Sequence, residues 1–182
     1  MDSHTKEQIR RGFLRVYKAT SYETISVKQI CAEAHVSRST FYSYYDSIHA
    51  VLEEIEDTLI SELFAINEEF RYADFKRWKK GEPFVYARET IDYIQEHLET
   101  FQILLGRNDP RFLYHWKRII RHHFREKFLL EGVQLRSQEL ILEMTASSLV
   151  GMYAYWVAHH DEVDVTELLN VALPRIFFDL LP

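Results

Sequence analysis

The stretch ISVKQICAEAHVSRSTFYSYY, residues 25–45, decides the fold, because it reads as two short helices with a tight turn between them. Ser26 begins an S-x-x-Q pattern, in which a serine caps a helix and a glutamine three residues later returns a hydrogen bond. Apolar residues then follow at helical spacing, at Val27, Ile30 and Ala34. The pattern predicts a helix that starts after Ser26 and buries one face.

Only His35 and Val36 separate this helix from the next one, which leaves enough chain for a tight turn and nothing more. Ser37 is in position to cap the second helix, which we expect to end at Tyr44 or Tyr45. Two helices joined in this way present the second one to the major groove of DNA. Residues 25–45 therefore predict a helix-turn-helix.

The exposed side of the second helix carries short hydroxyls, phenols and one arginine, and no acidic side chain. Hydroxyls and phenols donate hydrogen bonds to phosphate, and Arg38 is able to read guanine with two hydrogen bonds. Ser26 and Lys28 begin the preceding helix, where a flanking phosphate is within reach. We predict DNA contacts from Ser26, Lys28, Ser37, Arg38, Ser39, Thr40, Tyr42 and Tyr44, whereas Phe41 and Tyr45 hold the reading helix in place from within.

At these residues the chain resembles the TetR (tetracycline-repressor) family of bacterial transcription regulators. The resemblance runs over residues 9–52 and is most specific in the F-Y-x-Y-[FY] ending at Tyr45. It implies an all-α protein with a three-helix DNA-binding head and a helical bundle for ligand binding and dimerisation, which binds a palindromic operator as a homodimer. The family usually has glycine where this chain has His35, and often has lysine where it has Ile48.

Charge and composition fit this division of the chain. The net charge is −6, yet residues 1–48 hold seven basic against five acidic side chains, and residues 49–182 hold 15 against 23. A mildly basic head on an acidic body is the asymmetry expected of a DNA-binding regulator. The single cysteine, Cys31, fits packing in a reducing cytoplasm, and the sequence predicts neither a membrane span nor a signal peptide.

Helical spacing of apolar residues continues beyond the motif and predicts eight or nine helices without strands. An earlier helix carries Ile9, Phe13 and Val16, and a long fourth helix, capped by Asp46 or Ser47, runs to Phe70. The expected domains are a DNA-binding head, 1–47, and a regulatory and dimerisation domain, 48–182, with residues 71–83 as a boundary. Further helices are expected at about 86–105, 110–130, 137–159 and 164–180.

Local signals support these later helices. Asn108, Asp109 and Pro110 form a start signal, in which Asp109 caps and Pro110 takes the first helical position. Gly106 and Gly132 are expected to end the first two of these helices. Asp164 caps the last helix, and a kink is expected at Pro174.

The helix expected over 137–159 is apolar on two sides, so both sides must be covered. Together with the last helix it fits one half of a four-helix interface, which predicts a homodimer through about residues 137–181. Gly151 would permit close approach of the second copy. The alternative is that both helices are simply buried within one subunit.

Eight aromatic residues of the second domain form a candidate pocket for a small apolar or aromatic effector. They equally fit the ordinary filling of a helical core, and the sequence does not decide between the two. The residues are Tyr86, Tyr93, Phe101, Phe112, Trp116, Phe124, Tyr153 and Trp156.

Five histidines, His115, His122, His123, His159 and His160, raise the idea of a metal sensor. Carboxylates at ligand spacing are not evident, so solvated histidines are the favoured interpretation and no metal or cofactor is predicted. The sequence contains no glycine-rich phosphate loop, no H-E-x-x-H and no paired cysteines, so we do not expect an enzyme.

A rival function is that of a co-regulator that acts mainly through its C-terminal domain by binding a protein. Residues 111–127 are strongly basic, which usually marks a solvated face but also fits docking of an anionic ligand or an acidic protein surface. Residues 101–112, 149–157 and 164–169 resemble a divergent subgroup, the dihydroxyacetone kinase regulators, in which some members act with a protein partner.

Overall fold

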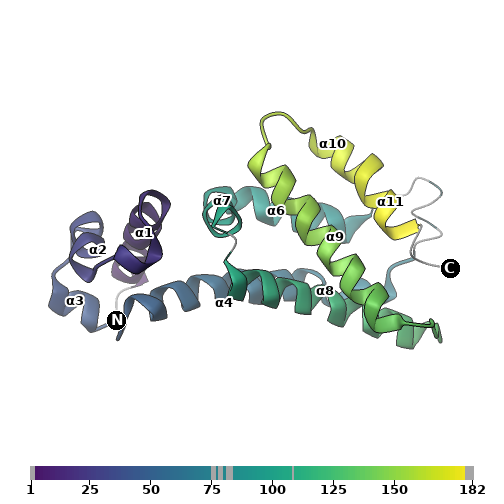
Figure 1. The fold of residues 1–182 in the computed structure, drawn as a ribbon, viewed down its shortest axis with the longest axis horizontal. Helices are drawn as coiled ribbons and strands as arrows, with labels where there is room; N and C mark the ends of the chain where they lie inside the picture. The colour runs from purple at the N-terminus through teal and green to yellow at the C-terminus, as the bar shows by residue number, and fades with distance from the viewer. Residues whose placement is uncertain (1–2, 75–76, 78–79, 81–83, 108, 179–182) are drawn as a thin grey trace. The chain divides into compact units, whose positions relative to one another are not determined.

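The computed structural model is all-α throughout the part of the chain that it describes, and it contains two compact units (Figure 1). We call Met1–Leu59 the head and Ile60–Pro182 the body. Their division falls inside α4 (Ile48–Ile66), so the first part of this helix belongs to the head, later than the expected boundary at 47/48. The structure describes residues 3–74, 77, 80, 84–107 and 109–178.

The head packs its first helices around a small apolar core that includes Ile9, Phe13, Ile30 and Phe41, all 0% exposed. Gly12 allows the closest approach, because a Cβ atom there would lie 2.9 Å from the Cβ of Ala34. The elements before α4 are α1 (Ser3–Ala19), the 3-10 turn η1 (Tyr22–Thr24), α2 (Val27–Ala34) and α3 (Arg38–Tyr42).

The ends of α4 explain its length. At the start, the backbone N–H of Ala50 donates to Ser47 Oγ at 3.1 Å, so Ser47 is the cap. At the end, Asn67 Nδ2 donates to the carbonyl of Leu63 at 3.0 Å. The prediction of a continuous helix to Phe70 is wrong, because the chain tightens here into a 3-10 helix, η2 (Glu68–Tyr72), that buries Phe70.

In its described residues the body has four longer helices and an irregular C-terminal one. The prediction for α8 is confirmed, because the carboxylate of Asp109 accepts from the N–H groups of Arg111 and Phe112 at 3.0 and 3.1 Å, ahead of Pro110. Gly132 follows that helix with a φ of +67°. The elements are α6 (Val85–Glu96), α7 (Leu98–Gly106), α8 (Pro110–Leu130), α9 (Gln138–Ala158), α10 (Val165–Glu167), the π-helical η3 (Leu168–Ala172) and α11 (Leu173–Phe178).

Three sequence expectations fall at least partly outside the described residues. They concern Asn108 in the start signal of α8, most of residues 75–83 in the predicted boundary, and residues 179–181 at the end of the predicted dimer segment.

The single helix expected over 86–105 is two helices, which corrects the prediction. The chain breaks at His97, where φ is −115° and ψ is 24°. Backbone bonds continue across the break, since His97 N–H donates to Tyr93 and its carbonyl accepts from Phe101. Buried residues keep helical spacing on both sides, so the apolar pattern carried no sign of the break.

The kink expected at Pro174 takes the form of the π-helical turn η3. The N–H of Leu173 donates to the carbonyl of Leu168, five residues earlier. Proline has no N–H to donate and its ring crowds the carbonyl four residues before it. The wider turn ahead of Pro174 accommodates both effects.

The long helix α9 has a buried face that packs against α7 and α8 (Figure 1). Leu142, Leu149 and Trp156 are among the residues of this face. By length and composition alone the helix would be long and apolar enough to cross a membrane, and 44% of the relevant window is buried.

Candidate functional site

The short helix α3 presents its predicted reading side outward. Arg38 and Ser39 are exposed, Tyr42 is 55% exposed and Thr40 is partly exposed. Within the described part of the chain no carboxylate pairs with Arg38, so its guanidinium is available to a base or a phosphate. The helix backbone is fixed from the other side by Phe41, which is fully buried.

Hydroxyl groups surround the start of α3. Ser37 Oγ accepts from the N–H of Thr40 at 3.0 Å and lies 2.7 Å from Ser39 Oγ and 2.8 Å from Thr40 Oγ1. The predicted cap is therefore confirmed. Because each hydroxyl has one donor and two acceptor positions, Ser39 and Thr40 keep hydrogen-bonding capacity for a ligand.

The turn before α3 adopts the left-handed conformation that the family usually assigns to glycine. His35 has a φ of 54° and a ψ of 40°, and the N–H of Val36 donates to the carbonyl of Cys31 at 3.0 Å. This pattern is a Schellman motif, which closes the end of α2. Cys31 is buried beside the turn, and burial raises the pKa of its thiol, which favours a packing role.

The two residues predicted to flank the reading helix lie at the start of α2. Ser26 and Gln29 form the complete capping box that the sequence predicts, with Ser26 N–H donating to Gln29 Oε1 at 2.8 Å. Lys28 is exposed on the first turn of the same helix. The serine hydroxyl is thus bound within α2, whereas the lysine ammonium points into solvent.

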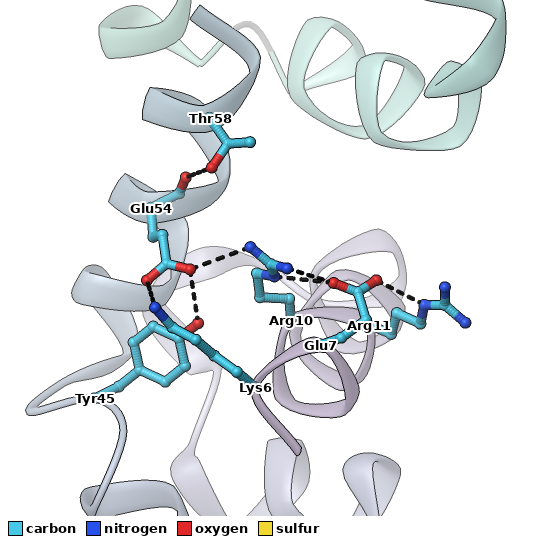
Figure 2. Close-up of polar contacts among 7 residues, drawn as sticks. All are labelled: Lys6, Glu7, Arg10, Arg11, Tyr45, Glu54 and Thr58. Carbon is cyan, nitrogen blue, oxygen red and sulfur yellow. Dashed lines mark hydrogen bonds and ion pairs between the residues drawn. The ribbon is translucent and has the colours of Figure 1, made fainter. Parts of the chain in front are cut away.

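An ionic cluster on α1 and α4 holds Tyr45, three residues after the end of α3, as Figure 2 shows. Glu54 of α4 binds Lys6 Nζ at 2.6 Å and Arg10 Nη1 at 3.1 Å, and it accepts from the Tyr45 hydroxyl at 3.2 Å. Arg10 also binds Glu7 at 2.6 Å. We call Lys6, Arg10, Tyr45 and Glu54 the Glu54 clamp, to which Glu7 is attached only through Arg10.

The clamp joins three segments of the head through one carboxylate. Tyr45 is only 4% exposed and its ring lies 6.0 Å from that of Phe41, the anchor of α3. Burial and then the nearby Glu54 carboxylate raise the pKa of Tyr45. Sequence reasoning missed Glu54, although Lys6 and Arg10, four residues apart on α1, were a sign of an acidic partner.

In the body, a cavity of about 50 Å³ is lined by part of the predicted aromatic set. Tyr86, Trp116, Phe124 and Tyr153 line it, and the rings of Trp116 and Tyr153 stack with centroids 5.6 Å apart. Complete burial raises the pKa of the Tyr153 phenol, which stays neutral.

The other predicted pocket residues lie elsewhere in the body. Phe101 and Phe112 are 0% exposed, with ring centroids 5.8 Å apart, and Trp156 is 1% exposed. Tyr93 lies against His97 at 4.6 Å, and burial raises its pKa to about 12. The structure therefore divides the aromatic set between cavity wall and core filling.

Three polar cavity residues were missed. Asn67, Thr90 and His123 line the cavity, and His123 is 5% exposed, so the interpretation of this residue as a solvated histidine is wrong. Its position at helical spacing from Trp116 and Ile119, both buried, is the signal that would have found it. The described residues contain no cluster of three or more side chains suited to hold a metal ion.

The basic side of α8 is largely neutralised by acidic groups of the body. Lys117 and Arg121 bind Glu143 at 3.6 and 2.6 Å, and Arg125 binds Glu139 at 2.9 Å. The solvated-face interpretation is wrong for Lys127, which is 1% exposed. Its ammonium donates to the carbonyl of Ala73 at 2.5 Å and binds Glu131 at 2.8 Å.

A row of apolar side chains remains exposed on the second side of α9. Leu140, Met144 and Tyr155 are 64%, 50% and 60% exposed. Exposed apolar side chains at helical spacing on one helix are typical of an interaction surface. We call these three residues the α9 stripe.

Comparison with known proteins identifies the head. Residues 11–55 match the family model described as bacterial regulatory proteins, tetR family. A curated relative, the uncharacterised HTH-type transcriptional regulator YxbF of Bacillus subtilis (strain 168), is 23% identical over 136 residues. That match covers 74% of this chain but only 34% of the relative.

Two solved structures share the fold over nearly the whole chain. A TetR transcriptional regulator from Streptococcus agalactiae 2603V has a TM-score of 0.67 at 23% identity, and the match covers 94% of this chain and 93% of that one. The dihydroxyacetone kinase operon activator DhaS has a TM-score of 0.62 at 16% identity, with 97% and 96% covered. These likenesses confirm the expected fold class.

Proposed function

The chain belongs to the tetR family of bacterial regulatory proteins, and we propose that this DNA-binding transcription regulator reads a palindromic operator as a homodimer in the cytoplasm. The observation that carries the proposal is the outward side of α3, with Arg38 exposed above the buried anchor Phe41. Two heads would contact half-sites about 34–36 Å apart, or a multiple of this distance.

Selection from a random DNA pool tests the proposal, and Arg38→Ala tests the reading residue. Loss of one bidentate base contact is expected to cost about 1–3 kcal/mol of sequence discrimination. Arg11→Ala is the matched control, because Arg11 is also cationic and exposed but lies on α1, paired with Glu7. Equal selectivity of wild type and Arg38→Ala in a gel-shift titration would contradict the assignment.

The α9 stripe supports self-association. A second copy would cover Leu140, Met144 and Tyr155, which the described body leaves to solvent. Met144→Glu places a charge in the stripe and is expected to shift the protein to monomer in sedimentation. Tyr114→Glu, at a residue on α8 that is 57% exposed, is the control and is expected to leave the dimer intact.

Control by a small molecule is the regulatory part of the proposal. The cavity of the body touches the end of α4 at Leu63, and α4 is one continuous helix that begins in the head. A ligand with different affinity for two positions of that helix would shift their populations and so change DNA affinity. The rival function, a co-regulator that docks partners on the basic helix α8, is disfavoured because Lys117, Arg121 and Arg125 are paired within the body.

A further inference from the structure

The cavity of the body has apolar and aromatic walls and uncharged polar groups. Among the described residues that line it there is no aspartate, glutamate, lysine or arginine. Its walls include Phe70, Trp116 and Phe124. None of these lining side chains offers a counter-charge, so an ionised ligand would lose its hydration without compensation from the cavity wall, which is costly in an apolar interior.

His123 places an unpaired ring nitrogen among the residues that line this space. Its Nε2 is buried and has no hydrogen-bond partner among the described residues, and its ring lies 4.9 Å from the ring of Phe64. Burial, followed by the neighbouring His122, lowers the pKa of His123 to about 4, so the ring is neutral at pH 7. A neutral imidazole whose proton is on the other nitrogen exposes a lone pair at Nε2.

The neighbouring polar group is already satisfied. Asn67 Nδ2 donates to the carbonyl of Leu63 and to Thr90 Oγ1, both at 3.0 Å. These two bonds link the residue after α4 to the last turn of that helix and to α6. A ligand held by His123 would therefore lie in the cavity that Asn67, the side chain bound to the end of α4, also lines.

We propose that the cavity binds a small, uncharged, largely apolar molecule that donates a hydroxyl or N–H hydrogen bond to His123 Nε2. The inference rests on the proposed function, because it names the chemical class of the effector. It excludes carboxylates and phosphorylated compounds. The volume of about 50 Å³ is smaller than the roughly 150 Å³ of an engineered apolar cavity that holds benzene, so the ligand is no larger than one ring and its entry widens the cavity.

Three ring compounds of similar size test this class with the full chain. Phenol offers a donor, toluene has a methyl group in its place, and benzoate carries a charge. In calorimetric titration we expect phenol to bind wild type about tenfold or more tightly than toluene, since an unpaired buried acceptor is costly. Benzoate is expected not to bind.

The variant His123→Phe removes the acceptor and keeps a planar ring against Phe64. It is expected to bind phenol and toluene equally. His122→Phe is the matched control, because His122 is the adjacent residue but does not line the cavity, and it is expected to keep the preference for phenol. If His123→Phe does not fold, the three-ligand comparison in wild type still decides the matter.

Equal binding of toluene and phenol in wild type, or binding of benzoate, would overturn the inference. Absence of binding by all three at millimolar concentration would also overturn it and leave a cavity that holds water only. DNA selection is scored separately. A chain that selects an operator but discriminates no ligand refutes this inference alone, whereas one that binds phenol but selects no DNA refutes the proposed operator reading.

Discussion

The head and the body differ in how closely their interiors are packed. In the head, α1 and α2 approach so closely that only glycine fits at position 12, and Glu54 binds Tyr45, three residues after the end of the reading helix. The body instead keeps a small cavity and a buried ring nitrogen of His123 that has no hydrogen-bond partner among the described residues. The head is therefore closely packed around the reading helix, whereas the body leaves unfilled space in its interior.

The two units are also spectroscopically distinct. All three tryptophans lie in the body, at positions 78, 116 and 156, and the head has none. Tryptophan fluorescence therefore follows the body, and amide hydrogen exchange in α1 and α2 follows the head.

The largest expected effect is acid destabilisation of the body through His123. The pKa of His123 is about 4 in the folded chain and 6.5 in the unfolded chain. Between these two pH values the unfolded chain therefore binds a proton at this residue, whereas the folded chain does not. Each pH unit in this window removes about 1.4 kcal/mol of unfolding free energy, or about 3 kcal/mol by pH 4. Urea unfolding at pH 7 and pH 5, followed by tryptophan fluorescence, measures the loss.

The control for acid destabilisation is His123→Phe, which does not titrate and is expected to flatten the pH dependence in this window. His122 and Arg71, the charged or titratable neighbours that also lower this pKa, remain in the variant. An identical slope in wild type and variant would show that other groups cause the acid sensitivity of the body.

The second effect concerns the head, where Gly12→Ala is expected to destabilise. The added Cβ would meet Ala34 Cβ at 2.9 Å and the carbonyl of Ile30 at 3.0 Å. Overpacking of this kind costs about 1–3 kcal/mol, more than the roughly 1 kcal/mol that alanine gains over glycine within a helix. Faster amide exchange in α1 and α2 is the measurement.

The double variant Gly12→Ala, Ala34→Gly adds a methyl group at position 12 of α1 and removes the facing methyl group at position 34 of α2. The pair is expected to recover part of the lost stability, although the contact with the Ile30 carbonyl remains. No recovery would mean that the backbone contact, and not the two methyl groups, requires glycine.

The third effect tests whether the Glu54 clamp positions the reading helix. Glu54→Gln and Tyr45→Phe are each expected to weaken operator binding several-fold, and the double variant is expected to lose less than the sum of the two. The carboxylate is 29% exposed, so water screens it and the coupling between the two changes should be about 1 kcal/mol or less.

Glu7→Gln is the matched control for the clamp. Glu7 binds Arg10 and Arg11 on α1 but does not contact Tyr45, so its loss should leave operator affinity nearly unchanged. If Glu7→Gln weakens binding as much as Glu54→Gln does, the cluster acts through net charge and not through Tyr45.

The sequence predicted those features that local chemistry determines. Ser26 with Gln29, Ser37, and Asp109 before Pro110 each place a hydrogen-bonding side chain or a fixed φ at a helix start, and the structure has all of them. The outward side of α3 follows from the same local pattern.

Features that depend on tertiary packing were less accessible from the sequence. The break at His97 leaves the apolar spacing unchanged, and the π-helical form of the kink before Pro174 depends on how the last helix packs. The acceptor on His123 becomes visible only when α4, α6 and α8 meet around one cavity, because single-chain periodicity marks that position simply as buried.

The smallest expected effect returns to glycine, this time in the body. A Cβ at Gly151 of α9 would have no atom within 4 Å, unlike the Cβ at Gly12. Gly151→Ala is therefore expected to stabilise the isolated chain by about 0.5–1 kcal/mol through reduced backbone entropy of the unfolded state. If a second copy packs against the α9 stripe, the same methyl group should weaken the dimer. The free energy of unfolding at low protein concentration would then rise, while the association constant of the dimer, measured by sedimentation, would fall. A rise in both quantities would place the interface on another surface.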